Sequence, residues 1–262
     1  MTPDSSKTWK GPARRRLYLP VAATVLAALL ALSAVASGEI IQTFSVKVKP
    51  RVEGKPISLR VNETTKENAA PQPPPMTRQV IYLQRGGKFN GKRFKRCRLS
   101  RLRAKGPKGC PKRSKIGTGT GTGSAKPILD NVNAKLTLFN GKRRHGNDTV
   151  YVFVLPDIGP TFVVVGEIKR RKGRYGHVLD FRIPPIKTLP LAPDASVTSV
   201  KTKTRRMKVT KRKRGKKRSY YLIRAPRKCG KYWHAKAKFF YANGEVETVK
   251  KKMRCKQRKS RR

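Results

Sequence analysis

Acidic residues are scarce in this chain of 262 residues. It has 13 Asp and Glu against 65 Lys and Arg, which gives a formal net charge of +52. Hydrophobic residues make up 37% of the sequence. That share, arranged in ordered runs, is too high for a wholly disordered polycation. Only one apolar run is long enough to span a bilayer, so the chain is not a polytopic membrane protein.

Residue patterns for catalysis and metal binding are also missing. The sequence has no Gly-x-Ser-x-Gly elbow, and the Gly-Thr run at residues 117–123 has the glycine spacing of neither a Rossmann loop nor a P-loop. The four cysteines lack the CxxC spacing typical of zinc sites. We therefore predict no catalytic residues, no cofactor and no metal site. An extracellular hydrolase with an unrecognised site is the alternative.

The few histidines and carboxylates have simpler explanations than catalysis. His177 falls on one face of a predicted strand with Tyr175, Leu179 and Phe181, which favours a hydrogen-bonded core histidine. Asp180 lies on the opposite face, so a His-Asp relay between the two is disfavoured. Ion pairing with the surplus cations accounts for the carboxylates that lie near strands and hairpin ends, namely Asp148, Asp157, Glu167 and Asp180.

The first 36 residues are predicted to be an export signal. Five basic residues precede an apolar run from Leu17 to Ala36, which ends in the small residues Ala34-Val35-Ala36. Cleavage there would leave Ser37 as the first residue. The apolar run is also long enough for an uncleaved membrane anchor. Arg14 to Arg16 leave the export route open between the Sec and twin-arginine pathways. Either way the remaining chain is expected to be secreted or held in the cell envelope, outside the cytoplasmic membrane.

The cysteine content agrees with export. Cys97, Cys110, Cys229 and Cys255 form an even set, which in an oxidising compartment indicates two disulfides with three possible connectivities. Local pairing, Cys97 with Cys110 and Cys229 with Cys255, is the simplest of these.

Alternating apolar and polar residues with frequent turn signals predict an all-β fold. We expect a β-sandwich of about ten to twelve mostly antiparallel strands. The expected single domain covers residues 37–255, after the signal or anchor helix, and a basic disordered tail covers 256–262. Residues 196–210 and 219–224 are predicted to form a hairpin around Gly215. The Gly-Thr run is predicted to be a strand whose glycine face permits close backbone approach.

Basic runs are the sharpest feature of the sequence. One run has seven cations around a single glycine at a predicted hairpin tip: Lys211, Arg212, Lys213, Arg214, Lys216, Lys217 and Arg218. A second zone covers residues 92–103, and a third is the tail from Lys250 to Arg262. A polycation outside the cell meets polyanions, so we predict non-specific contact with an anionic cell-wall polymer, an acidic polysaccharide or extracellular nucleic acid. A membrane partner is expected only if the signal segment is not cleaved. A structural surface protein without a specific partner is a further alternative.

Several short motifs are spread along the predicted domain: residues 88–90 with Phe94 and Cys97, 109–111, 114–119, 173–179, 226–229 with Trp233, and 239–241. These motifs resemble those of a family of exported, disulfide-containing β-rich proteins from high-GC actinobacteria. The similarity extends roughly from Phe44 to Cys255. It implies a secreted domain in which the cysteine positions recur, and it implies no activity. Members are usually less basic, and proline usually stands where this chain has Gly230.

Overall fold

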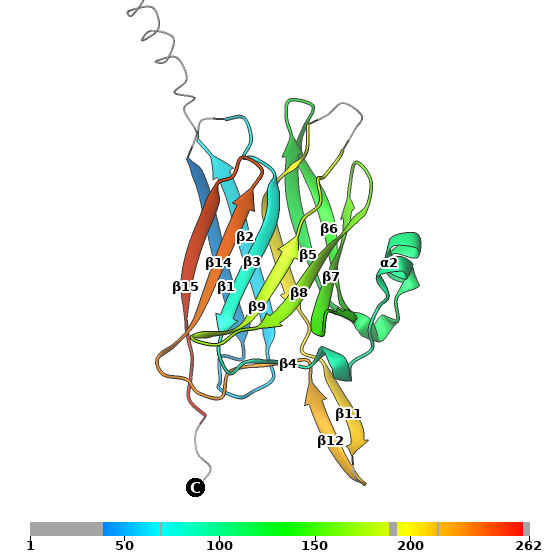
Figure 1. Ribbon diagram of the computed structural model, residues 1–262, viewed down its shortest axis with the longest axis vertical. Helices are drawn as coiled ribbons and strands as arrows, with labels where there is room; N and C mark the ends of the chain where they lie inside the picture. Colours follow the sequence, from blue (N-terminus) through cyan, green and yellow to red (C-terminus); the bar gives the residue numbers. More distant parts are fainter. Residues whose placement is uncertain (1–38, 69, 189–192, 214, 259–262) are drawn as a thin grey trace, which may run out of the picture. The chain divides into compact units, whose positions relative to one another are not determined.

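The computed structural model describes residues 39–68, 70–188, 193–213 and 215–258, so the predicted signal segment lies outside the described residues. The chain from Gly38 onward clusters as one unit, separate from residues 1–37. It contains one sheet of 11 strands and two short two-stranded sheets (Figure 1). No helix in the described part of the chain is long and apolar enough to cross a membrane.

Every neighbouring pair of strands in the main sheet is antiparallel. In sheet order the strands are β1 (Ile40–Lys49), β2 (Ser58–Glu67), β10 (Ser196–Thr204), β5 (Lys115–Ala125), β6 (Leu129–Arg144), β7 (Asn147–Pro156), β8 (Phe162–Arg170), β9 (Tyr175–Arg182), β3 (Met76–Gln84), β14 (Tyr232–Tyr241) and β15 (Val246–Arg254). The short sheets pair β11 (Lys208–Lys213) with β12 (Lys216–Tyr221), and β4 (Lys88–Phe89) with β13 (Ile223–Arg224). The helical segments are α2 (Leu99–Lys105) and the 3-10 turns η2 (Gly91–Arg93), η3 (Gly106–Gly109) and η4 (Lys112–Ser114).

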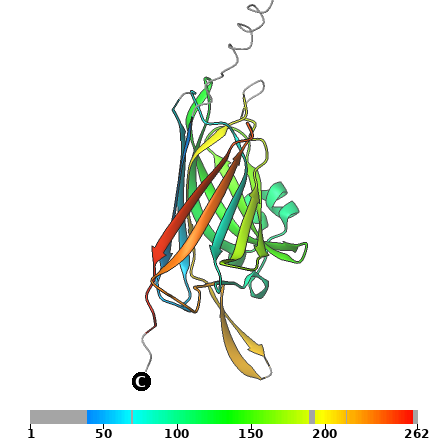
Figure 2. The same cartoon turned by 60° about the vertical axis from the view of Figure 1, so that its left-hand side comes forward.

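The predicted all-β fold of mostly antiparallel strands is confirmed. Its two facing layers are halves of one continuous sheet, which curls until β1 packs against β15 (Figure 2). No ladder of hydrogen bonds joins these two edge strands. Inside the curl, the Glu63 side chain on β2 accepts a hydrogen bond from Gln79 on β3, which is not a neighbour of β2 in the sheet. The interior therefore lies between the two halves.

The continuous apolar runs of β7 and β8 have apolar partners on both faces. Val150 and Val154 of β7 face the interior, where they pack in one cluster with Leu136. The intervening Tyr151 and Phe153 face outward and pack against the segment that contains α2. A strand covered on both faces needs apolar residues at every position rather than at alternate ones.

The Gly-Thr run forms β5, as predicted. A Cβ atom at Gly117 or Gly119 would collide with the main-chain oxygens of Lys203 and Lys201 on the neighbouring strand β10. The two backbones therefore approach so closely that only glycine fits on this face.

Two details of the strand prediction are wrong. The expected strand from Ser196 to Thr210 ends at Thr204 because its partner β5 begins there, and the hairpin around Gly215 is a separate ribbon. Tyr175 does not share the face of His177, because a register shift at Gly176 turns it outward against Tyr82.

The chain stays ordered beyond Cys255. The main chain of Lys256 pairs with that of Arg51, and the amide of Arg258 donates to the Glu53 carboxylate. Of the predicted tail, residues 256–258 are thus held against the sheet, and 259–262 lie outside the described residues.

Candidate polyanion-binding surface

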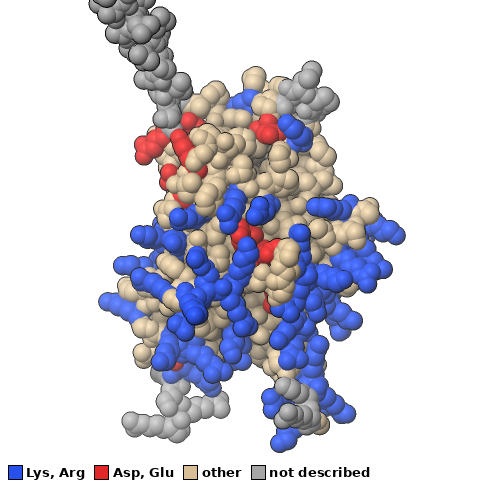
Figure 3. Space-filling model, in the orientation of Figure 1, with Lys and Arg blue, Asp and Glu red and all other residues tan. Residues whose placement is uncertain are grey.

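Charge is distributed unequally between the two ends of the sheet. The antiparallel order brings the turns after β1, β3, β6, β8 and β10 to one end, together with the β11–β12 ribbon. We call this the basic end; its connections are residues 50–57, 85–98, 145–146, 171–174, 205–213 and 215–231. Most of the carboxylates lie toward the other end, which we call the acidic end: Glu39, Glu67, Asp130, Asp157, Asp194, Glu245 and Glu247. Figure 3 shows Lys and Arg crowded toward the basic end of the visible face.

The predicted hairpin exists and places like charges opposite each other. Lys211 faces Arg218 and Arg212 faces Lys217 across the β11–β12 ladder, and all four are exposed. Gly215 turns the chain with a φ of 74°. Of the other predicted cations, Lys216 is exposed and pairs with Lys213, whose side chain is not described, and Arg214 lies outside the described residues. Directly opposed like charges destabilise a strand pair.

The ribbon is anchored only at its base. The amide of Leu222 donates to Met207 across the base at 3.1 Å, and the guanidinium of Arg93 lies 4.7 Å from the ring centre of Tyr220. Beyond the base the ribbon projects past the sheet (Figure 2). Among the described residues, no ion pair includes a cation of this ribbon. Its positive charge is thus left without a protein counter-charge there.

The second basic zone is fixed to the sheet beside the ribbon. The buried Asn140 of β6 donates from Nδ2 to the carbonyl oxygens of Gly91 and Lys95, each at 3.0 Å. Cys97 continues this attachment, since its main-chain amide donates to the main-chain carbonyl oxygen of Asn140 at 2.8 Å. These bonds fix the start of the zone, where Arg93 contacts Tyr220 of the ribbon. Arg101 and Arg103 are exposed on α2.

Sequence reasoning missed a basic stripe on the outer face of β14 and β15. Lys236 and Lys238 alternate with buried residues on β14, and Lys236 pairs with Lys250 on β15. The Lys236 ammonium lies 4.3 Å from the ring centre of Tyr82 and 5.5 Å from that of Tyr175. Burial lowers the pKa of Lys236, and the nearby cations Lys238, Lys250 and Arg171 lower it further. The signal in the sequence was the period-two spacing of Lys236 and Lys238 on β14, together with the three consecutive lysines 250–252 on β15.

A basic groove was also missed, because its residues come from five separate segments. It has a volume of about 950 Å³ beside the basic end of β1, β2 and β10. No described residue in its lining is acidic. Its charged lining residues are Lys49, Arg51, Arg60, Lys203, Arg205, Arg206 and Lys256.

The carboxylates with predicted structural roles mostly have cationic partners. Asp180 accepts from Arg78 Nε at 2.8 Å and from Lys169 Nζ at 2.9 Å. Hydrogen bonding to Arg78 is the main cause that lowers the pKa of Asp180 to about 2. Asp148 lies 3.6 Å from Arg143 Nε, and Glu167 lies 3.3 Å from the ring of His145. No ion pair is found for Asp157 among the described residues.

His177 faces the sheet interior and is half-buried, but its ring makes no hydrogen bond among the described residues, so the predicted hydrogen-bonded core histidine is not found. Burial is the main cause that lowers its pKa, and the nearby Arg170 lowers it further. Across the parts of the chain that the structure describes, no cluster of His, Cys, Asp and Glu could hold a metal ion.

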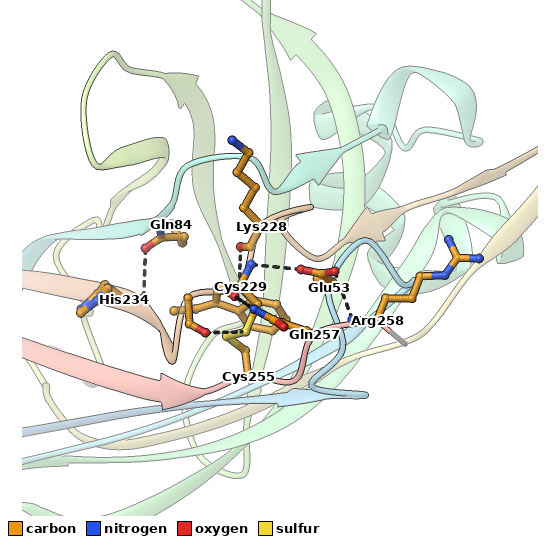
Figure 4. The surroundings of a disulfide bond; sticks show 10 residues. Glu53, Gln84, Lys228, Cys229, His234, Cys255, Gln257 and Arg258 are labelled. Atoms are coloured by element: carbon orange, nitrogen blue, oxygen red, sulfur yellow. Dashed lines mark hydrogen bonds between the residues drawn. A yellow bond between two sulfur atoms is a disulfide. The ribbon is translucent and has the colours of Figure 1, made fainter. Parts of the chain in front are cut away.

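Both disulfides have the predicted local connectivity, Cys97 with Cys110 and Cys229 with Cys255. Figure 4 shows how the second bond joins the end of β15 to the chain before β14. The Glu53 carboxylate accepts hydrogen bonds from the main-chain amides of Cys229 and Arg258, each at 3.1 Å. It thus stabilises both the chain before β14 and the chain after β15. Two disulfides agree with an oxidising environment outside the cytoplasm.

Comparison of the chain with protein-family models, with curated proteins and with solved structures gave no match. The resemblance to the actinobacterial family therefore stays an expectation. A function for this chain has to be argued from its own geometry.

Proposed function

We propose that this domain is a secreted or wall-associated, non-enzymatic binder of anionic polymers, which it contacts through the basic end. The observation that carries the proposal is the β11–β12 ribbon. Its opposed like charges, Lys211 with Arg218 and Arg212 with Lys217, have no acidic partner among the described residues. A polymer with repeated negative charges would relieve this repulsion.

Electrostatics makes the proposed contact strong at low salt and independent of sequence. Each phosphate or other anion that a Lys or Arg neutralises releases a condensed counterion, so affinity falls steeply as salt rises. The basic stripe adds Tyr82 and Tyr175, on which sugar rings or bases can stack beside Lys236. The ribbon, the basic stripe and the basic groove all lie at or toward the same end of the sheet, so one extended polymer can contact several of them.

The ribbon is tested by the salt dependence of binding to duplex DNA, heparin and a teichoic-type polymer. If four to six ribbon cations reach phosphates, the log–log slope for DNA is roughly −4 to −5, at about 0.9 per contact. The variant K211Q/R212Q/K217Q/R218Q should flatten that slope by about 3 units. The fold should survive, because these side chains are exposed and the ribbon lies outside the main sheet.

A matched control removes the same charge elsewhere. Lys66, Lys135, Arg182 and Lys201 are exposed on strands of the main sheet, away from the ribbon. Their joint change to Gln should leave the slope within about one unit of the wild-type value. Equal effects of the two quadruple variants would mean that the charge acts diffusely. No binding to any of the three polymers at low salt would favour a purely structural surface protein.

The location has its own test. Cleavage after Ala36 predicts exported protein that begins at Ser37 and is recovered from the medium or loosely from the wall. N-terminal sequencing of that fraction checks this. Recovery of Met1-containing chains from membranes alone would mean an uncleaved anchor.

A further inference from the structure

The interior of the curled sheet is hollow along part of its length. A cavity of about 310 Å³ lies between the strands, within the size range of small-molecule sites. Its lining is almost entirely apolar. Inward-facing side chains such as Val152, Val164 and Leu179 border it and are only partly buried, although they point into the sheet. In a filled core such residues would be fully covered.

The cavity is long and narrow. On β7 its lining runs from Val150 to Pro156, and on β8 from Phe162 to Ile168. Six residues of strand, at a rise of about 3.4 Å each, span about 20 Å. A volume of about 310 Å³ over that length suits a linear chain better than a broad ring system.

Few polar groups are available inside. Glu63 is the one carboxylate in the described lining, and its side chain accepts a hydrogen bond from Gln79. The cationic and titratable side chains of the lining are Lys88, His177, Lys187 and Arg224. Lys88 is exposed to solvent, Arg224 donates to the main chain of Gly54, and Lys187 pairs with Asp194 at 2.8 Å. Burial lowers the pKa of His177, which favours its neutral form. An apolar cavity of this kind holds water poorly, so hydrocarbon is the ligand chemistry that matches it.

The two ends of the cavity differ. At the basic end, Phe89 of β4 and Ile223 of β13 line it, and this strand pair crosses that end of the sheet (Figure 1). At the acidic end the lining comes from loops and includes Ile158, which is 49% exposed. Ile128, on the turn between β5 and β6, is also exposed at this end. Ile158 thus gives an apolar ligand a surface to contact at the cavity lining, with Ile128 exposed at the same end of the sheet.

We infer that this cavity binds the hydrocarbon chain of a single-chain lipid, whose head group lies at the acidic end. The shape sets the chain length and the apolar walls supply the affinity. Because the walls recognise the chain, a fatty acid and a fatty alcohol of equal length are expected to bind alike. This site is separate from the surface proposed for anionic polymers.

The test displaces a fluorescent 16-carbon fatty acid from the purified full chain, with hexadecanoic acid, hexadecanol and their eight-carbon counterparts as competitors. Each buried methylene improves affinity roughly fourfold, so the 16-carbon compounds should compete at least about 100-fold better than the eight-carbon ones. Failure of the probe to bind, or equal competition by short and long chains, would overturn the inference. Competition by hexadecanol but not by the acid, or the reverse, would show that the head group decides, which also contradicts it.

Variants locate the binding. Val152 and Val164 face each other across β7 and β8 and both line the cavity. V152F/V164F should weaken probe binding by about tenfold or more, because the added rings occupy the space of the chain. V246F places the same ring on an exposed residue of β15 and should leave binding unchanged. If the double variant fails to fold, Ala134→Leu, which enlarges another lining residue, replaces it. Wild-type affinity in a folded cavity variant would show that the chain binds elsewhere.

Discussion

The two sides of the interior are built differently although the same sheet forms both. On the inward face of β14, the large side chains Trp233 and Phe239 flank the small Ala235 and Ala237, and all four are at most 2% exposed. Of these four, only Trp233 borders the cavity. Phe44 of β1 meets Phe239 edge to face, with ring centres 6.2 Å apart. On β7 the inward residues 150, 152 and 154 are all valines, and β8 adds Val164 and Gly166, so short side chains face the interior and the cavity remains there. Large residues packed beside small ones fill space, whereas a row of short branched residues leaves a gap.

Truncation of a large residue should show the greatest contrast between the two sides. Phe239→Ala on the packed side should lower the free energy of unfolding by about 3–5 kcal/mol, because it opens a new cavity. Phe162→Ala on the hollow side should cost less than half of that, since its ring already borders empty space. Denaturant unfolding of both variants measures the difference. Equal costs would mean that the hollow side is filled in solution.

Removal of the disulfide on the packed side should lower the free energy of unfolding slightly more than removal of the one beside the hollow side. Cys229–Cys255 closes a separation of 26 residues on the packed side, and Cys97–Cys110 closes 13 outside the hollow side. Loop entropy predicts losses of about 3.5 and about 3 kcal/mol when each pair is changed to Ser. Thermal unfolding of the two double variants ranks them. A larger loss for the shorter loop would mean that strain or packing dominates over loop length.

The buried carboxyl between the two sides should make stability depend on pH. Burial raises the pKa of Glu63 from 4.5 to about 7, so the folded state holds a proton that the unfolded state releases. Protonated Glu63 therefore contributes to the free energy of unfolding in full below about pH 4.5. This contribution, on the order of 3 kcal/mol, is lost as the pH rises to about 7. Asp180, whose pKa is lowered to about 2, has the opposite sign and acts below about pH 4.

Glu63→Gln isolates that dependence. The variant should lose the fall in unfolding free energy between about pH 5 and 7, and it should be more stable than wild type at pH 8. Denaturant titrations at several pH values measure this. A pH profile identical to that of the wild type would show that Glu63 does not titrate in this range.

Enlargement of a residue should give the smallest effects. Ala237→Val on the packed side should cost about 1–3 kcal/mol, because no space is left for two more methyl groups. Val164→Phe on the hollow side should change stability by less than about 1 kcal/mol, since its ring enters the cavity. Calorimetry of the two single variants compares them. A penalty at Val164 as large as that at Ala237 would contradict the described cavity.

Local rules predicted much of the fold and part of the surface. Alternation and turn residues identified most strands, the short cysteine loops indicated the correct pairing, and the cationic run around Gly215 is a hairpin. The register shift at Gly176 was not predictable, because it depends on how close Arg85 approaches the backbone there. The cavity and the basic groove were also missed. Each is formed by segments that are far apart in the sequence and come together only through the order of strands in the sheet. That order cannot be predicted from the residue pattern of any one segment.

The segregation of charge makes the described domain an electric dipole. Near a negatively charged surface, such a molecule experiences a torque that turns its positive end toward the surface before contact. The ribbon, the basic stripe and the basic groove then lie against the polymer, and the apolar residues Ile128 and Ile158 at the acidic end face the surrounding solution. Attachment and ligand exchange would thus take place at opposite poles, and neither would block the other.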